Sequence, residues 1–389
     1  MNRLAVVLFS TLLLLLSVID TLAVELSGYY EPQYLGIRIN DSNSQLFSSK
    51  LRVDLQSSDI DNVKFAANFD YITYHGHTQW NMLDYLPKTI TSIVPSDAIR
   101  SFDFIYNDTI FLDNAYLKFA VSKFDITLGK QQISPGTGYA WNPTDLFNSK
   151  NIIDPTYEQS GHNAVRIDFA ASSRYSVMFI GLPEQAWNNS GKMISFKGKL
   201  SHFDYSMTYI EKQWLLSDFI TYQMSEQKRR LYGGDLVGEL FGLGIWGEYG
   251  YNTMKSHSDF WEALIGIDYT LDNGAYLMAE YYYNELGQDD YHQYDINDWM
   301  RYFLTESRTI SKDNLYLYFS YPLTDLIQLD NSVIISLSDK SFGIVPAFQY
   351  SIYENVDLNA LINYNIGDDE KAYSNGQGIS GTVRFRIYF

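Results

Sequence analysis

The chain has 389 residues, 28 of them basic and 46 acidic, so its net charge is −18, and it contains no cysteine. The acidic balance disfavours nucleic acid as a partner. The lack of cysteine excludes disulfides, thiolate metal sites and cysteine nucleophiles. Charged residues make up only 19% of the chain, below the value of about 25% that is usual in soluble domains. With 33 Tyr, 23 Phe and 25 Gly, this composition favours a protein built largely of strands.

The first residues have the pattern of a secretory signal peptide. Asn2 and Arg3 give a basic start, an apolar run follows from Leu4 to Val18, and Thr21-Leu22-Ala23 offers a cleavage site between small residues. A membrane anchor is the alternative, but the run is shorter than the roughly 20 apolar residues that a spanning helix needs. We therefore expect residues 1–23 to be removed and residues 24–389 to form one domain.

The rest of the chain alternates between apolar and polar residues with a period of two, which is the period of a strand. At the end of the chain, Val383, Phe385, Ile387 and Phe389 alternate with more polar residues. Similar patterns predict eighteen strands near 25–40, 44–57, 62–75, 110–122, 124–134, 161–171, 174–182, 192–202, 204–215, 229–241, 243–252, 259–271, 274–287, 311–323, 326–338, 341–352, 355–366 and 378–389.

The connections between these segments alternate between short and long. Tight turns such as 122–123, 241–243 and 354–355 fall between long segments such as 76–109, 135–160 and 288–310. This sorting is typical of an outer-membrane barrel, and a sheet in lipid must close because its edges find no water. We predict an all-β protein, a closed antiparallel transmembrane barrel of about 18 strands, with 16 or 14 as alternatives. Its short turns would be periplasmic and its long loops extracellular.

The last strand carries a separate signal. Apolar residues at every second position end in Phe389. This resembles the terminal strand of bacterial outer-membrane proteins, and the resemblance implies that Phe389 is read by the barrel-assembly machinery. The partners that we expect are therefore outer-membrane lipid, that machinery and small solutes, with a homo-oligomer as a further possibility.

If apolar positions face lipid, charged positions between them line the lumen. One predicted arc is largely basic and comprises Arg38, Lys50, Arg52, Lys118, Arg166, Lys197, Lys199, Arg384 and Arg386. The opposing arc is acidic and comprises Glu239, Glu248, Glu262, Asp268 and Glu280. Charged arcs on low-dielectric walls set up a field across a wet bore and serve as selectivity devices. The alternative is that these charges only keep the lumen wet and pair with one another.

The long segment 135–160 is rich in turn residues and in aromatic side chains. We expect it to fold back into the lumen and to narrow the bore, because its apolar residues would be costly in water. The alternative is a loop packed at the outer rim. The predicted constriction residues are Pro135, Tyr139, Trp141, Asn142, Pro143, Asp145 and Phe147.

This stretch resembles a family of Gram-negative outer-membrane channels related to alginate-export and substrate-selective porin barrels. The family pattern is Gly-x-Gln, a Trp-Gly-x-Gly turn and then Trp-Asn-Pro-x-Asp-x-Phe. This chain departs from it in two places: Ser134-Pro135 stands where an aromatic residue and Gly are often seen, and Lys130 where Arg is frequent. The matching residues are Gly129, Gln131, Gly136, Gly138, Trp141, Asn142, Pro143, Asp145 and Phe147. The resemblance implies solute passage without naming a solute.

Signals for other chemistry are weak. His75 and His77 lack a third metal ligand nearby, and no Gly-x-Ser-x-Gly nucleophile elbow is present. We expect no catalytic residue, no metal and no cofactor. The predicted function is an outer-membrane channel for passive diffusion of small hydrophilic solutes. The alternatives are a barrel for polysaccharide export or surface attachment, and a barrel that carries a hydrolase site.

Overall fold

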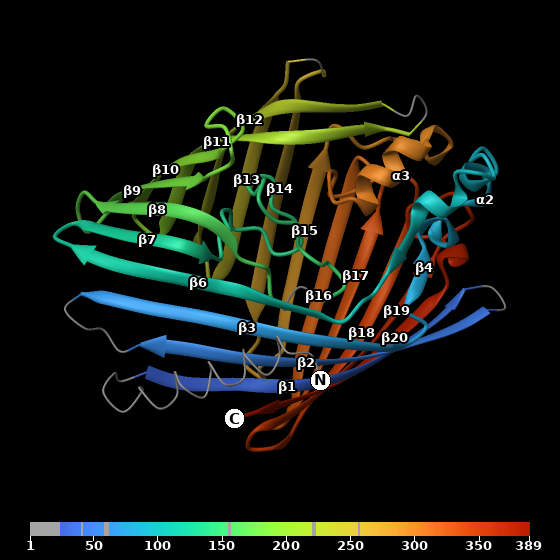
Figure 1. Cartoon of the computed structure of the whole chain (residues 1–389), viewed down its shortest axis with the longest axis horizontal. Helices are drawn as coiled ribbons and strands as arrows, with labels where there is room; N and C mark the ends of the chain where they lie inside the picture. Colours follow the sequence, from blue (N-terminus) through green and yellow to red (C-terminus); the bar gives the residue numbers. More distant parts are fainter. Residues whose placement is uncertain (1–23, 40–41, 58–61, 155–156, 220–222, 256) are drawn as a thin grey trace, which may run out of the picture.

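The computed structural model shows an antiparallel sheet of 18 strands that closes on itself as a barrel (Figure 1). The structure describes residues 24–39, 42–57, 62–154, 157–219, 223–255 and 257–389, so the predicted signal peptide lies outside the described residues. The barrel strands are β1 (Val24–Ile39), β2 (Ser42–Ser57), β3 (Val63–Gly76), β6 (Thr109–Val121), β7 (Phe124–Gln131), β8 (His162–Ala170), β9 (Tyr175–Leu182), β10 (Gly191–Leu200), β11 (Phe203–Asp218), β12 (Gln223–Leu240), β13 (Leu243–Thr253), β14 (Phe260–Thr270), β15 (Tyr276–Asn284), β16 (Asp313–Thr324), β17 (Ile327–Ser336), β18 (Ser341–Tyr353), β19 (Val356–Ile366) and β20 (Ile379–Tyr388).

The barrel closes between its first and last strands. β1 pairs with β2 on one side and with β20 on the other, and Tyr30 lies opposite Ile387. Beyond β20, the N–H of Phe389 donates to the carbonyl of Gly28 at 3.0 Å, and the N–H of Gly28 donates back to Phe389 at 3.0 Å. The C-terminal residue thus completes the seam, and the sheet keeps no free edge there.

The predicted barrel and its count of eighteen strands are confirmed, and the strand ends agree to within two residues except at the ends of β7, β11 and β15 and at the start of β12. β12 begins at Gln223 rather than at 229, because β11 and β12 stay paired as far as Asp218 and Gln223. This extension is polar, so it carries no alternation from which a strand is predicted. β7 ends at Gln131 rather than at 134, because the chain turns inward and buries Ile133.

The alternation of each strand separates an apolar outer face from a more polar inner face. Outward side chains such as Leu200, Met207 and Ile265 are 71%, 64% and 65% exposed. So much exposed apolar surface around the wall fits contact with lipid rather than with water. The inner face carries the polar residues that are discussed below.

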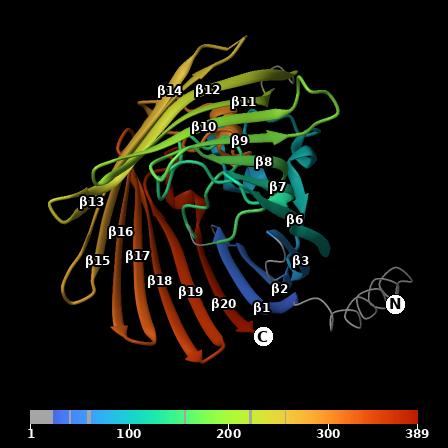
Figure 2. The same cartoon turned by 90° about the vertical axis from the view of Figure 1, so that its left-hand side faces the viewer.

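One end of the barrel has tight turns and the other has long loops, as Figures 1 and 2 show. We call them the short-turn end and the long-loop end. At the short-turn end, Ser122, Ser201 and Phe241 each have a φ of 56°, the left-handed backbone that two-residue hairpin turns use.

Short elements in three segments cover part of the long-loop end. Between β3 and β6 lie β4 (Gln79–Asn81), η2 (Met82–Tyr85), α2 (Lys88–Thr91), η3 (Ile99–Phe102) and β5 (Asp103–Ile105). Between β15 and β16 lie η4 (Tyr291–Gln293) and α3 (Ile296–Phe303), and η5 (Asn375–Gln377) precedes β20. Asp295 and Asp298 form a capping box that starts α3. Within the described residues, no helix is both long and apolar enough to cross a membrane.

The core lies inside the barrel and under these loops. Leu83, Ile90, Trp299 and Met300 of the loops form one buried cluster with Trp141 and with wall residues such as Tyr282 and Tyr316. This cluster ties the long-loop end to the chain segment that occupies the lumen.

Candidate functional site

Strand register places eight of the nine predicted basic residues on the inner face. Arg38 is the exception, and its assignment to the lumen is wrong. It shares a face of β1 with the outward-facing Tyr30, lies opposite the outward-facing Ile379 and is exposed. In the last residues of β1 the apolar side chains lie on the inner face and the polar ones on the outer face. The sequence pattern therefore predicts the wrong face for Arg38.

The segment between β7 and β8, described for residues 132–154 and 157–161, enters the barrel, as Figure 2 shows in a view turned toward the short-turn end. We call it the lumen loop. Its interior turns are fixed locally. Asp145 accepts the N–H groups of Phe147 and Asn148 at 2.7 and 3.0 Å, and the side chain of Asn142 donates to the carbonyl of Pro135 at 3.2 Å.

Two wall carboxylates bind the backbone of the lumen loop. Glu248 of β13 accepts the N–H groups of Thr137, Gly138 and Thr144, the last two at 2.5 and 3.2 Å. The hydroxyl of Thr144 adds a bond at 2.9 Å. Because this carboxylate is only 4% exposed, it depends on these donors for the hydrogen bonds that water would otherwise supply.

Glu280 of β15 binds the next part of the loop in the same way. It accepts the N–H groups of Tyr139, Ala140 and Trp141 at 2.7, 2.9 and 3.1 Å, and the indole N–H of Trp246 at 2.7 Å. Glu280 is 0% exposed. Three consecutive backbone donors that converge on one carboxylate form a nest for an anion.

Glycines allow this close approach. Gly136 has a φ of +89°, and a Cβ there would lie 2.6 Å from Oε1 of Glu248. At Gly138 a Cβ would lie 1.9 Å from the carbonyl oxygen of Trp141. Gly136 is therefore required by the contact between loop and wall, and Gly138 by the close approach of the loop backbone to itself at Trp141.

Apolar contacts add to the hydrogen bonds. Trp141 is 2% exposed and stacks on Tyr282 of β15, with ring centroids 5.1 Å apart and planes 17° apart. Phe147 packs with Ile133 and with wall residues that include Ile180 and Leu231. The aromatic residues that the sequence placed in the lumen do lie on the inner wall.

The third predicted acidic residue is also buried. Glu262 of β14 is 2% exposed and forms ion pairs with Arg229 at 3.1 Å and with Arg308 at 2.7 Å. Arg308, from the segment between β15 and β16, also donates to the carbonyl of Asp145 in the lumen loop. Glu248, Glu262 and Glu280 face inward as predicted, but the prediction that they present charge to open water is wrong. Glu248 and Glu280 are hydrogen-bonded by the loop, and Glu262 is paired with two arginines.

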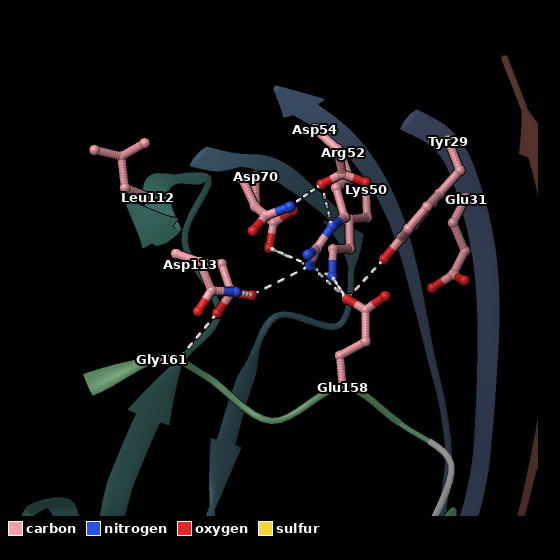
Figure 3. A network of polar contacts seen from close by, with 12 residues as sticks. Tyr29, Glu31, Lys50, Arg52, Asp54, Asp70, Leu112, Asp113, Glu158 and Gly161 are labelled. Carbon is pink, nitrogen blue, oxygen red and sulfur yellow. Dashed lines mark hydrogen bonds and ion pairs between the residues drawn. The ribbon is translucent and has the colours of Figure 1, made fainter. Parts of the chain in front are cut away.

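The far end of the lumen loop reaches the opposite, basic wall (Figure 3). Glu158 accepts bonds from Lys50 at 3.1 Å, from Arg52 at 2.7 Å and from the hydroxyl of Tyr29 at 3.0 Å. Asp70 and Asp113 also contact Arg52, at 4.0 and 3.2 Å. Burial alone would raise the pKa of the Glu158 carboxyl, but Lys50 and Arg52 outweigh it and hold that pKa below 4.5.

The C-terminal strand provides a further attachment. Asp154 of the loop pairs with Arg384 of β20 at 2.9 Å, and Arg386 pairs with Glu31 of β1 at 2.6 Å. The lumen loop is thus bound by its backbone to the acidic wall (β13 and β15) and by its carboxylates to the basic wall (β1, β2 and β20). It runs from one wall to the other.

Cavities remain on both sides of the loop. Toward the short-turn end, one of about 740 Å³ is lined by Lys118, Arg166 and Gln131 among others, and one of about 450 Å³ by Lys197, Lys199 and Asp235 among others. Toward the long-loop end, a cavity of about 380 Å³ is lined by Trp141 and Arg308 among others. A second one there, of about 290 Å³, is lined by Asp145 and Lys212 among others. The lumen loop therefore divides the interior of the barrel.

The charges on the short-turn side pair locally. Lys118 lies 3.0 Å from Asp125, Arg166 lies 2.7 Å from Asp168, and Lys199 lies 3.9 Å from Asp204. Glu239 and Asp268 also face inward near this end, and Asp268 accepts the hydroxyl of Tyr276 at 2.8 Å. The two cavities here are lined by six basic and six acidic side chains.

The residues that sequence reasoning missed are the partners of the predicted ones. Glu158, Asp154 and Arg308 lie in loops, where no periodicity indicates the direction of a side chain. The one argument that could have predicted them is that a buried charge in the wall needs an opposite charge nearby. Where side chains are described, no group of three or more His, Cys, Asp or Glu residues could hold a metal ion. His162 bonds instead to Asn148 at 2.8 Å.

Comparison with known proteins gives the fold. No family model and no curated protein matches the chain. Among solved structures, OccAB1 of Acinetobacter baumannii has a TM-score of 0.59 at 11% identity, over 94% of this chain and 96% of that one. OccAB4 of the same organism gives 0.57 at 9% identity, over 94% and 98%. OccK5 (OpdH) of Pseudomonas aeruginosa gives 0.56 at 10% identity, over 94% and 97%. At these identities the likeness shows a shared barrel fold.

A first prediction concerns the acidic wall. Glu280→Ala should loosen residues 139–141 by about 1–3 kcal/mol for each backbone donor that loses its acceptor in this buried site. Hydrogen exchange of these amides measures the change. Glu239→Ala removes an acidic residue of the inner face near the short-turn end and should leave the exchange rates unchanged. Equal rates in both variants would contradict the anchoring role.

A second prediction concerns pH at the basic wall. The pKa of Glu158 is lowered, so its contribution is fully present above 4.5 and is lost as the pH falls through its lower native value. The lumen loop should become more sensitive to pepsin as the pH decreases from 5 to 3. Glu158→Gln should remove most of this pH dependence, whereas Asp125→Asn, away from the loop, should keep it.

A third prediction has the opposite sign. Burial raises the pKa of Glu306, next to α3, to about 7, so the charged form is disfavoured in the folded loop. The local stability should decrease as the pH rises from 4.5 toward 7 and should stay level above that. Hydrogen exchange of α3 at pH 5 and pH 8, corrected for the intrinsic rate, tests this. Glu306→Gln should abolish the difference, and a persistent difference would refute it.

Proposed function

We propose that this chain is an outer-membrane channel through which small hydrophilic solutes diffuse passively, with the lumen loop as its constriction. One observation carries the proposal. The loop lies inside the barrel, is bound to opposite walls and leaves cavities on both sides. A loop that served only to seal the rim would not need buried carboxylates in the wall to hold it.

The proposal includes a location and an orientation. The predicted signal peptide would direct export of the chain, and the apolar outer face would place the barrel in the outer membrane. The long-loop end would face outward and the short-turn end the periplasm. Phe389, which completes the seam with Gly28, would serve as the signal for barrel assembly.

The inner surface supports weak rather than strong discrimination by charge. The acidic arc is covered by the lumen loop, and Lys50, Arg52, Arg384 and Arg386 are paired with carboxylates. The cavities on the short-turn side balance their charges over short distances. Pairs this close produce little field across a bore many ångströms wide, particularly at physiological salt. Size would therefore limit passage more than charge does.

A fourth prediction tests the channel. The mature chain in a planar lipid bilayer should give stepwise conductance, with a reversal potential close to zero in a salt gradient. A folded barrel, verified by its shifted mobility on a gel before boiling, that carries no current would contradict the proposal.

The constriction is tested separately. Glu248→Ala combined with Glu280→Ala should raise the single-channel conductance and admit larger uncharged polymers, because the loop loses its acidic-wall anchors. Glu239→Ala is the matched control and should leave both quantities near the original values. If the double variant kept the same size limit for polymers, the proposal that the lumen loop is the constriction would be contradicted.

A further inference from the structure

The outer face of the wall carries a charged cluster where lipid-facing residues are expected. Lys192 of β10, Glu211 of β11, and Lys228 and Arg230 of β12 lie there, and we call them the rim cluster. Lys192 is two residues from Ile194, Glu211 two from Tyr209, and Arg230 two from Tyr232, and these three neighbours are outward-facing. The rim cluster therefore points away from the lumen.

The register fixes the level of this cluster on the wall. Lys192, Glu211 and Arg230 pair across neighbouring strands in one row. The next row toward the short-turn end holds Ile194, Tyr209, Tyr232 and Tyr251, and the row after it holds Phe196, Met207 and Tyr249. Tyr209 and Tyr232 lie against each other with ring centroids 5.2 Å apart.

This succession is that of a membrane boundary. An apolar band ends in an aromatic row, as at the interfaces of outer-membrane barrels, and charges follow one step beyond it. Two residues advance a strand by about 6.6 Å. A cation at the middle of the bilayer costs about 2–4 kcal/mol, and the cost falls to about 0–1 near the interface. The rim cluster therefore sits at the depth of lipid headgroups.

The cluster has more positive than negative charge. Glu211 is contacted by Lys192 at 3.5 Å, by Lys228 at 3.0 Å and by Arg230 at 3.0 Å. One carboxylate thus organises three cations, and among these four side chains two positive charges are left over. The Arg230 side chain is 49% exposed and that of Glu211 only 13%. The surface presents the cations outward and covers the anion.

The excess positive charge of the rim cluster indicates which kind of ligand it would bind. Arginine and lysine that converge at headgroup depth fit a phosphate group, which accepts several charge-assisted hydrogen bonds at once. A second copy of the chain related by a two-fold axis would bring the same basic surface against itself, and like charges would repel. The leaflet that surrounds the barrel supplies facing phosphate groups at this depth.

We propose that the rim cluster binds the phosphate-bearing headgroup of a lipid in the leaflet around the long-loop end. Glu211 is a positioning residue that holds the three cations together, and Lys228 and Arg230 contact the phosphate. The lipid tails would lie along the apolar outer face of β10–β12, below Tyr209 and Tyr232. The site concerns attachment to the membrane and is separate from the proposed channel.

The test compares lipid binding to matched variants in detergent by native mass spectrometry. The probes are diphosphoryl lipid A and its monophosphoryl form. The protein should bind the diphosphoryl lipid more tightly, and Lys228→Gln with Arg230→Gln should weaken that binding by about tenfold or more, because two cations near the headgroup are removed. Lys192 remains to pair with Glu211 in this variant, which protects the fold.

Two controls make the outcome specific. Lys123→Gln with Arg174→Gln removes two charges from turns at the opposite end of the barrel and should leave binding unchanged. Lys228→Arg with Arg230→Lys keeps the charges and should keep the lipid. Inorganic phosphate at about 50 mM should compete poorly, since it lacks the tails that the apolar face holds.

Several results would overturn the proposal. Equal loss of lipid in both double glutamine variants would show a non-specific charge effect. Complete displacement by inorganic phosphate would show a plain anion site. A change of oligomeric mass in the Lys228→Gln, Arg230→Gln variant, with its lipid retained, would show a contact between copies. Conductance of this variant should equal that of the original chain, so the failure of this proposal is distinguishable from failure of the channel.

Discussion

The arrangement inside the barrel depends on two carboxylates that are buried away from solvent. Glu248 and Glu280 lie in the wall at 4% and 0% exposure, where an unpaired charge costs several kcal/mol. The lumen loop supplies six backbone N–H groups to them. Each partner therefore requires the other. If the loop left the lumen, both buried carboxylates would lose their hydrogen-bond donors. If the wall lacked these carboxylates, the N–H groups in the turns of the loop would have no acceptor.

The second attachment has the opposite polarity. On the acidic wall the loop gives donors, whereas on the basic wall it gives the carboxylates of Asp154 and Glu158 to arginines and lysine. Most residues of the two predicted arcs lie on the inner face, and several of them bind the loop. Many of these charges therefore interact within the protein rather than with a solute, and Lys118 and Arg166 at the short-turn end pair with near neighbours.

The sequence was sufficient for the barrel because lipid imposes a strict alternation on every spanning strand. Leu200, Met207 and Ile265 show this face directly. The same rule failed where strands leave the apolar band, at Arg38 and in the polar extension of β12. It also could not give the burial of Glu248 or Glu280, because alternation says which way a side chain points and not what covers it. Trp141 and the glycines at 136 and 138 marked the covering segment correctly, whereas Glu158 and Arg308 had no local pattern at all.

The attachment of one loop to facing walls also has a mechanical consequence. An empty cylinder one sheet thick flattens easily, because its strands can shear and bend without breaking many bonds. The lumen loop is bound to two facing walls and resists a change in the distance between them. The cross-section of the barrel is therefore stiffer along the loop than across it. The outline of the lumen then depends on the length of the loop between Trp141 and Asp154, which pairs with Arg384, as well as on the number of strands. Shortening this segment by a few residues would draw the walls together, and the aperture would change with no alteration to the sheet.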